Sequence, residues 1–233
     1  MNSPSDAAPA KKSLLTRERI LDAAAHVLSR KGYAGTRLAD VAEVAQVQAP
    51  AIYYYFPSRD ELIEEVMWAG VFRVHRHVRE TLAALPESAS ALDRILAAVE
   101  AHLRYELQIS DYTTASIRNA GQVPEQLRTR PAAEEAAYSR IWTGLLHQAA
   151  EAGELRPGLD INVSRLLLLG SMNWAAEWWN PHTRSLTDLV QASQDMVRYG
   201  MGNPAGFGAP QADRSGQLPP ENGTGSGADP RNH

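Results

Sequence analysis

The sequence predicts an all-α fold, and three observations support this prediction. Apolar residues recur at helical spacing through most of the chain between residues 14 and 202. No segment alternates apolar and polar residues convincingly, as a half-buried strand would. Capping boxes, in which a serine precedes an acidic residue by three positions, mark helix starts at Ser58, Ser90 and Ser185.

About nine helices follow from these signals. Thr16 is the expected N-cap of the first helix, and Gly32 is expected to end it. Thr36 is expected to cap the second helix, and Pro50 stands in the first turn of the third, where a missing N–H costs nothing. We expect helices over residues 16–31, 37–44, 49–55, 58–84, 90–108, 111–120, 131–152, 161–179 and 186–200.

Composition and pattern divide the chain into four parts. Residues 1–13 are expected to form a flexible arm, residues 14–60 a small three-helix domain, and residues 61–202 a larger helical domain. Residues 203–233 are dominated by Gly, Pro, Asn, Ser and Asp. Such a segment cannot bury enough apolar surface to fold, so we expect it to be disordered.

Composition also narrows the function classes. The absence of cysteine excludes disulfides and thiolate metal sites and fits a reducing cytoplasm. The sequence has no apolar run of about twenty residues, which a membrane span would need, and no secretory signal. It also lacks HExxH, GxSxG, GxGxxG and P-loop motifs, so we expect no enzyme, no metal and no cofactor. Residues 1–60 carry eight Lys/Arg against six acids, a mild excess compatible with a nucleic-acid partner.

The informative stretch is residues 36–62, TRLADVAEVAQVQAPAIYYYFPSRDEL. Two short helices that cross steeply need a small residue where they touch, and Ala42 fits that requirement. Val41, Val47 and Ile52 supply apolar contacts between the helices, and Phe56 lies on the same face as Ile52. This arrangement is a helix-turn-helix.

Three consecutive tyrosines, Tyr53 to Tyr55, follow Ile52. They cannot all be buried on so short a helix, because neighbouring side chains point about 100° apart. An exposed phenol hydroxyl can hydrogen-bond a phosphate oxygen. The alternative is a small helical subdomain in which the tyrosines are packing residues.

This stretch resembles the N-terminal signature of the tetracycline-repressor (TetR) family of transcriptional regulators, in which a helix-turn-helix leads into an L/I-Y-x-x-F motif and a charged fourth helix. The resemblance covers about residues 16–65. The first helix and the Gly32-Tyr33 pair also fit it. The matching residues are Thr36, Val41, Ala42, Val47, Ile52, Tyr53, Phe56, Ser58, Arg59, Glu61 and Leu62.

The resemblance implies a role for each position of the motif. The helix at 48–55 would lie in the major groove of double-stranded DNA, with Gln48, Ala49 and Ala51 nearest the base edges. Phosphates would be held by Thr36, Tyr53, Tyr55 and Arg59, the first and last from helix N-termini. Arg37 could reach a phosphate or a base, and so could Tyr54.

Two positions depart from the family pattern. The turn commonly carries Gly but here has Gln46, which would be strained by about 1 kcal/mol if its φ is positive. Position 39 is Ala, where many relatives have a long polar side chain. The operator sequence is therefore not predictable.

The last two predicted helices suggest a homodimer. One helix-turn-helix reads few base pairs, so useful affinity needs two copies on a near-palindrome. The helix near 161–179 is apolar almost all round and must be covered on several sides, by the core and by a second subunit. The helix near 186–200 carries an apolar stripe of Leu186, Leu189, Val190, Ser193 and Val197.

The run from Leu169 to Trp179, LGSMNWAAEWW, resembles a branch of TetR regulators that respond to acyl-CoA thioesters in lipid, steroid or aromatic-acid catabolism. That resemblance implies an apolar pocket for the acyl part and a ligand that releases a repressor. Asn173, Trp174 and Trp178 could also be interface residues. Arg118, with Arg128 and Arg130, could meet CoA phosphates or lie on a solvated surface. The other candidate lining residues are His102, Tyr105, Tyr138 and Trp142.

Two other functions remain open from the sequence. One is an efflux-type regulator that senses an apolar, drug-like ligand. The other is a helical interaction module without DNA contact. The sequence does not identify the effector, the operator or the regulated genes, nor does it separate a repressor from an activator.

Overall fold

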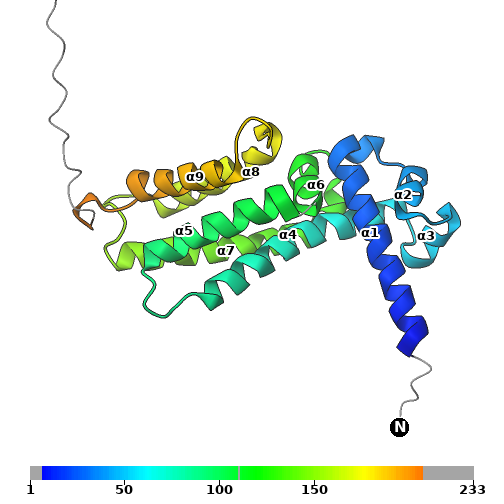
Figure 1. Ribbon diagram of the computed structural model, residues 1–233, viewed down its shortest axis with the longest axis horizontal. Coiled ribbons are helices and arrows are strands. Elements are labelled where there is room, and N and C mark those ends of the chain that lie inside the picture. The colour runs from blue at the N-terminus through cyan, green and yellow to red at the C-terminus, as the bar shows by residue number, and fades with distance from the viewer. Residues whose placement is uncertain (1–6, 110, 207–233) are drawn as a thin grey trace, which may run out of the picture.

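A computed structural model describes residues 7–109 and 111–206 of the chain. Within these ranges the chain forms nine α-helices and no strand, which confirms the all-α prediction (Figure 1). The α-helices are α1 (Ala7–Gly35), α2 (Leu38–Ala45), α3 (Ala49–Tyr55), α4 (Arg59–Ala84), α5 (Ala91–Arg104), α6 (Asp111–Asn119), α7 (Thr129–Glu151), α8 (Ile161–Trp178) and α9 (Leu186–Gly200).

Helices α1, α2 and α3 gather at one end of the elongated molecule (Figure 1). Ile20, Leu28, Val41 and Ile52 are fully buried there, and the same core continues into the first half of α4 and into α6. The small domain is therefore packed against the larger one through a shared core.

The predicted start of the first helix is wrong. Helix α1 begins at Ala7, and Thr16 lies inside it with its hydroxyl donating to the Lys12 carbonyl at 3.0 Å. A threonine can form such a bond from within a helix as readily as it can cap one. The predicted end is supported by the backbone, because helical geometry is interrupted at Gly32, where φ is 70°. Residues 1–6 of the expected arm lie outside the described residues.

The predicted capping boxes are confirmed. The hydroxyls of Ser58, Ser90 and Ser185 accept hydrogen bonds from the backbone N–H groups three residues later, at 3.1, 3.0 and 3.1 Å. These strong local signals explain why the starts of α4, α5 and α9 are predictable.

The helix expected over 90–108 is not one continuous α-helix. Helix α5 ends at Arg104, and the chain continues as a π-helical turn, Tyr105–Ile109. Such a turn adds one residue relative to α-helical winding, so side chains after it face directions that a simple periodicity does not predict. Glu106, within the turn, is buried with 1% of its surface exposed.

Helices α4 and α6 cross in direct contact at Gly70. A methyl group at Gly70 would lie 2.5 Å from the backbone oxygen of Tyr112, so no larger residue fits there without a shift. The Thr113 and Ser116 hydroxyls donate to the carbonyls of Gly70 and Met67, at 3.4 and 3.3 Å. This crossing fixes α6 on α4.

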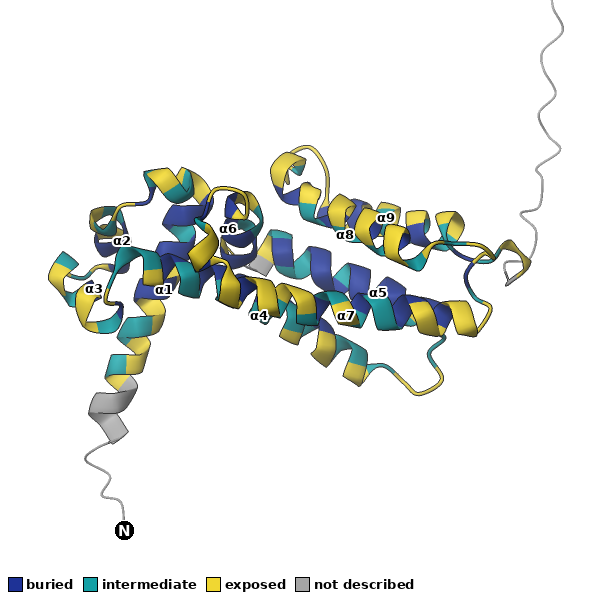
Figure 2. Cartoon of the chain, turned by 180° about the vertical axis from the view of Figure 1, so that it is seen from behind, coloured by how far each residue is buried: buried dark blue, intermediate teal, exposed yellow. Residues whose placement is uncertain are grey.

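Helices α8 and α9 cover one side of the bundle, and their outward surface is exposed (Figure 2). The α9 stripe assigned to a dimer packs inside the chain instead, since Leu186, Leu189, Val190 and Val197 are buried in the larger core. The outward face carries other apolar side chains, all at least 47% exposed, namely Val163, Leu166, Leu167, Trp174, Trp178, Met196 and Tyr199.

After α9 the chain returns to the α7–α8 loop, where Leu155 and Gly202 form an isolated bridge, and Pro204–Gly206 makes a 3₁₀ turn. The rest of the expected disordered tail, 207–233, lies outside the described residues. None of the helices described is both long and apolar enough to span a bilayer.

Candidate nucleic-acid interface and ligand cavity

Helix α3 is fixed from one side and exposed on the other. Ile52 and Phe56 are 0% and 3% exposed and hold the helix against the core. Tyr53 and Tyr54 are 56% and 81% exposed, so the tyrosine run does point outward in large part. Tyr55 is half-buried and meets the Tyr54 ring edge-on at 4.9 Å between centroids.

The other predicted DNA residues of this end differ in exposure. Gln48 is the exposed residue that precedes α3, and Arg37 is the exposed residue that precedes α2. Ala49 and Ala51 are half-buried on α3. The helix end therefore presents two polar side chains and two tyrosines to solvent.

The turn between α2 and α3 has the predicted strained geometry. Gln46 has φ 54° and ψ 46°, the left-handed conformation, and its backbone N–H points to the carbonyls of Ala42 and Glu43. Among the described residues other than glycine, it alone has a positive φ. The turn is thus formed without the glycine that would adopt this conformation at lower cost.

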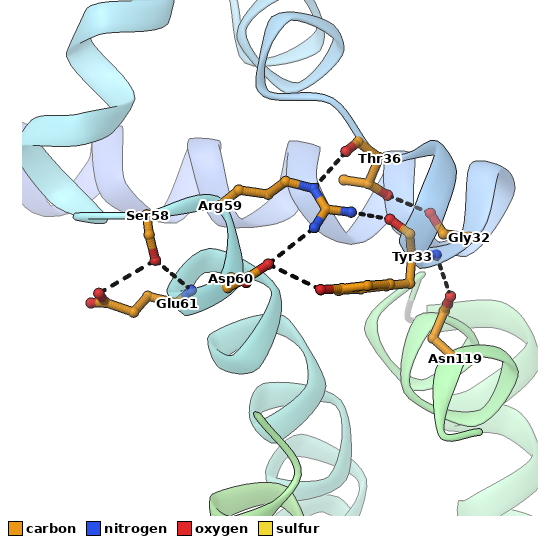
Figure 3. Close-up of polar contacts among 8 residues, drawn as sticks. All are labelled: Gly32, Tyr33, Thr36, Ser58, Arg59, Asp60, Glu61 and Asn119. Carbon is orange, nitrogen blue, oxygen red and sulfur yellow. Dashed lines mark hydrogen bonds and ion pairs between the residues drawn. The ribbon is translucent and has the colours of Figure 1, made fainter. Parts of the chain in front are cut away.

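Arg59 is committed to contacts within the chain (Figure 3). Its Nε donates to the Thr36 carbonyl at 2.8 Å, and one terminal nitrogen donates to the Tyr33 carbonyl. The other terminal nitrogen pairs with Asp60 at 3.0 Å, and the guanidinium lies 4.4 Å from the centre of the Tyr33 ring. Arg59 therefore binds the end of α1 to the start of α4.

Thr36 does not cap α2 as predicted. Its side chain is buried, and its hydroxyl donates to the Gly32 carbonyl at 2.7 Å (Figure 3). The residue preceding α2 is Arg37, with no side-chain cap. The Thr36 hydroxyl turns back because the backbone interruption at Gly32 leaves that carbonyl free.

Asn119 at the end of α6 joins this group from the other side (Figure 3). It is fully buried, its side-chain oxygen accepts from the Tyr33 N–H at 2.7 Å, and its side-chain nitrogen donates to the carbonyls of Leu28 and Ala115. We call Tyr33, Thr36, Arg59, Asp60 and Asn119 the junction cluster. It connects α1, α4 and α6.

Arg118, a predicted phosphate contact, is also engaged. It pairs with Glu177 at 3.0 Å and donates to the carbonyl oxygens of Ala176 and Ser29 at 2.6 and 3.4 Å. This one side chain connects α6 to the end of α8 and to α1.

A cavity of about 570 Å³ lies among α4, α5, α6, α7 and α8. Three of the predicted ligand residues, His102, Tyr138 and Asn173, line it. Apolar wall residues include Val71 and Val74 of α4. Small-molecule sites in proteins commonly have volumes of about 300 to 1,000 Å³.

The remaining predicted ligand residues lie outside the cavity wall. Trp142 is completely buried in the core behind His102 and Tyr138, and the Tyr105 ring packs against His77. Trp174 and Trp178 are 64% and 47% exposed on the outward face of α8.

A buried polar group stands beside the cavity. His102 Nδ1 is 2.8 Å from the Tyr138 hydroxyl, and His102 Nε2 is 2.9 Å from a Glu106 oxygen. The contact between His102 Nε2 and Glu106 does not have hydrogen-bond geometry. His102 Nε2 and both carboxylate oxygens of Glu106 therefore lack a well-formed hydrogen bond. Burial raises the pKa of Glu106. We call His102, Glu106, Tyr138 and Trp142 the cavity cluster.

A second cavity of about 440 Å³ adjoins the first and shares Ala120, Ala132 and Glu135 with it. Arg128 lies on its wall. Arg130 instead pairs with Glu65, which also binds Arg17 at 3.0 Å. Of the three arginines considered for CoA, Arg128 alone lines a cavity.

Sequence reasoning missed Arg165 on the wall of the first cavity and the burial of Glu106 beside it. Arg165 lines the wall and its NH1 atom donates to the Ser139 hydroxyl at 2.6 Å. Arg165 directly precedes the apolar run Leu166–Leu169, and this was an available signal, because a charge beside such a run needs a partner.

Comparison with known families gives two matches. Residues 20–66 match the family described as bacterial regulatory proteins, tetR family. Residues 88–201 match the tetracyclin repressor-like C-terminal domain. Among curated proteins, the chain is 23% identical over 185 residues to the fatty acid metabolism regulator protein of Bacillus subtilis, covering 77% of this chain and 90% of that protein.

Solved structures share the fold. AibR, in complex with isovaleryl coenzyme A and operator DNA, superposes with a TM-score of 0.71 at 19% identity, over 78% of this chain and 97% of that chain. FadR from Bacillus subtilis, in complex with stearoyl-CoA, gives a TM-score of 0.66 at 20% identity, over 78% and 98%.

Proposed function

This chain belongs to the tetR family of bacterial regulatory proteins, and from that premise we propose a dimeric repressor that an acyl-CoA thioester releases from its operator. The observation that carries the proposal is a cavity of about 570 Å³ whose wall includes α6, the helix that holds the DNA-reading end through Asn119. A ligand in the cavity would therefore contact an element already bonded to the reading end.

The exposed side of α3 and its flanks supply the proposed DNA contacts. Arg37, Gln48, Tyr53 and Tyr54 are exposed and offer hydrogen-bond donors to phosphates and bases. Ala49, Ala51 and Tyr55 would contribute contacts from their half-buried positions. Thr36 and Arg59, whose polar groups are occupied within the chain, would act by holding α2 and α4 in register rather than by binding phosphate.

The outward face of α8 and α9 supports a homodimer. Leu167 and Trp174 are 70% and 64% exposed on α8, and Met196 and Tyr199 are 68% and 65% exposed on α9. Exposed apolar side chains in this number on two helices that cover one side of the bundle are unfavourable in water and favour an interaction site there. Two copies joined here would present two reading ends to one near-palindromic site.

The two adjoining cavities suit the two parts of an acyl-CoA. The acyl part would occupy the first cavity, and Arg128 on the wall of the second would meet the phosphates of CoA. The relatives crystallised with stearoyl-CoA and isovaleryl coenzyme A support this class of ligand. Release requires that the ligand bind more tightly to the state whose reading ends no longer fit the operator.

DNA binding can be tested with the promoter fragment upstream of the chain's own gene at fixed salt. We expect Tyr54→Ala to weaken binding about ten-fold without changing stability, since Tyr54 is 81% exposed. Arg37→Ala should reduce the salt slope of log K by about 1. Arg79→Ala, the same charge change on an exposed part of α4, is the control and should change neither. Unchanged binding in both test variants would contradict the assigned surface.

The ligand is tested with a series of saturated acyl-CoA thioesters of increasing chain length. At least one should raise the melting temperature and release the promoter fragment, while free CoA does neither. If no thioester acts but apolar, drug-like compounds release DNA, the protein is an efflux-type regulator instead.

A further inference from the structure

Arg165 is a cation in the cavity wall without an anionic partner. It pairs with no Asp or Glu among the residues that the structure describes, and its one hydrogen bond runs from NH1 to the Ser139 hydroxyl at 2.6 Å. Its Nε is buried and has no hydrogen-bond partner. Arg165 is only partly exposed, and a guanidinium in such a position favours an oxygen anion that can accept from several of its N–H groups.

The one acidic side chain on the same wall does not neutralise Arg165. Glu135 lines the cavity, and the charge that acts on it is that of Arg128, not Arg165. Burial raises the pKa of the Glu135 carboxyl, but the residue is exposed and makes no hydrogen bond or ion pair with Arg165, whose one bond is to Ser139. The positive charge of Arg165 therefore remains available to a ligand.

The position of Arg165 separates it from the proposed CoA site. Its partner Ser139 lies ten residues along α7 from Thr129, which lines the second cavity beside Arg128. At 1.5 Å per residue, this is about 15 Å along the helix. With CoA phosphates at Arg128, Arg165 would face a different part of the ligand, the acyl part.

We propose that Arg165 and Ser139 form a subsite for a carboxylate on the acyl part of the ligand. The inference rests on the proposed acyl-CoA function and narrows it to thioesters of dicarboxylic acids or of other acids that carry a second carboxylate. The carboxylate accepts from the guanidinium N–H groups of Arg165 that the bond to Ser139 leaves unused and from the Ser139 hydroxyl, whose bond from NH1 leaves its own proton to donate. A plain fatty acyl chain would leave the charge of Arg165 unpaired.

The test is calorimetric titration of the full-length protein with pairs of thioesters that differ only at the far end of the acyl chain. The pairs are hexanoyl-CoA and adipoyl-CoA, octanoyl-CoA and suberoyl-CoA, and decanoyl-CoA and sebacoyl-CoA. The proteins are wild type, Arg165→Gln, Arg165→Lys and Ser139→Ala. Arg140→Gln, an exposed arginine on α7 outside the cavity wall, is the matched control.

We expect the wild type to bind the carboxylate member of one pair at least ten-fold more tightly than its partner, an effect typical of a charge-assisted bond. Arg165→Gln should abolish that preference, Arg165→Lys should retain part of it, and Arg140→Gln should leave it intact. Ser139→Ala keeps the charge and should reduce the preference by a smaller factor, which gives a second measure if Arg165→Gln folds poorly.

Four results would overturn the inference. Equal affinity for both members of every pair, with thioesters still binding, removes the carboxylate subsite and leaves the proposed function standing. An equal loss for both members in Arg165→Gln places Arg165 on the CoA part. A change of Arg165→Gln from dimer to monomer in light scattering makes Arg165 a subunit contact. If no thioester binds at all, the proposed function fails as well.

Discussion

The cavity cluster is buried throughout, and the junction cluster contains two buried polar residues, Thr36 and Asn119. The two clusters differ in how completely the hydrogen bonds of their buried groups are formed. Asn119 uses its side-chain oxygen and nitrogen on the backbone of α1 and α6. In the cavity cluster, His102 Nε2, the carboxylate oxygens of Glu106 and Trp142 Nε1 lack well-formed bonds. A completed network fixes one geometry, whereas an incomplete one costs stability and favours whatever supplies the missing bonds.

Breaking the completed network should have the largest effect. Asn119→Ala leaves the Tyr33 N–H and the Leu28 and Ala115 carbonyls without their partner in a fully buried place. We expect the free energy of unfolding to fall by about 3 kcal/mol, measured by urea denaturation. Asn180→Ala, at an exposed position, should cost less than about 1 kcal/mol. If both variants lost the same free energy of unfolding, the hydrogen bonds of Asn119 would contribute no more to stability than those of an exposed asparagine.

Substitution in the cavity cluster should instead increase the free energy of unfolding. Glu106→Gln keeps the shape and removes an ionisable group that is buried without well-formed bonds, so we expect the free energy of unfolding at neutral pH to rise by about 1 to 2 kcal/mol. Glu100→Gln, in a partly exposed i,i+4 pair with Arg104 on α5, should change it by less than about 0.5 kcal/mol.

The pH dependence of the Glu106→Gln variant follows from the raised pKa of Glu106. Below the ordinary value of 4.5, the carboxyl is protonated in both states and burial carries no ionisation penalty. The penalty grows as the pH rises from 4.5 through the pKa of the folded state. The gain from the substitution should therefore be larger at neutral pH than at pH 4.5, and a constant gain would contradict the assigned cause.

Substitution of Glu65 should have the smallest effect on stability, and that effect should be confined to pH values at which the carboxyl is ionised. Burial raises its pKa, but hydrogen bonds from Arg130 and Arg17 outweigh burial and lower the pKa overall. Its stabilisation is therefore present above the ordinary value of 4.5 and is lost as the pH falls through the pKa of the folded state. Glu65→Gln should cost about 1 kcal/mol at neutral pH, with the difference from wild type disappearing in acid. A loss that persists in acid would show that packing, not charge, is responsible.

The helices were predictable wherever local chemistry determines them. Ser58, Ser90 and Ser185 cap helices as expected, because a cap depends on residues only a few positions apart. The start of α1 was missed because Thr16 can bond to the carbonyl of Lys12 inside a helix as well as cap one. The π-helical turn at Tyr105–Ile109 was missed because the spacing of apolar residues in the sequence does not reveal the tertiary packing around this turn.

The candidate sites were predictable in part, for the same reason. The exposure of Tyr53 and Tyr54 follows from their spacing relative to Ile52 and Phe56. The hydrogen bonds from Arg59 to the carbonyls of Tyr33 and Thr36 do not follow from local spacing. They depend on how α1 packs against α4, and the partners are more than twenty residues apart in the chain. The outward direction of Trp174 likewise depends on which side of α8 the bundle covers.

The crossing at Gly70 brings three contacts of α6 close together. The backbone of Tyr112 and the Cβ of Ser116 both lie against Gly70 of α4, and Ser116 also lies on the wall of the first cavity. Asn119, three residues further along, holds the backbone of α1. The support on α4, the cavity wall and the bond to α1 therefore fall within about two turns of one helix, so in the proposed mechanism a ligand could not shift this part of α6 without altering all three.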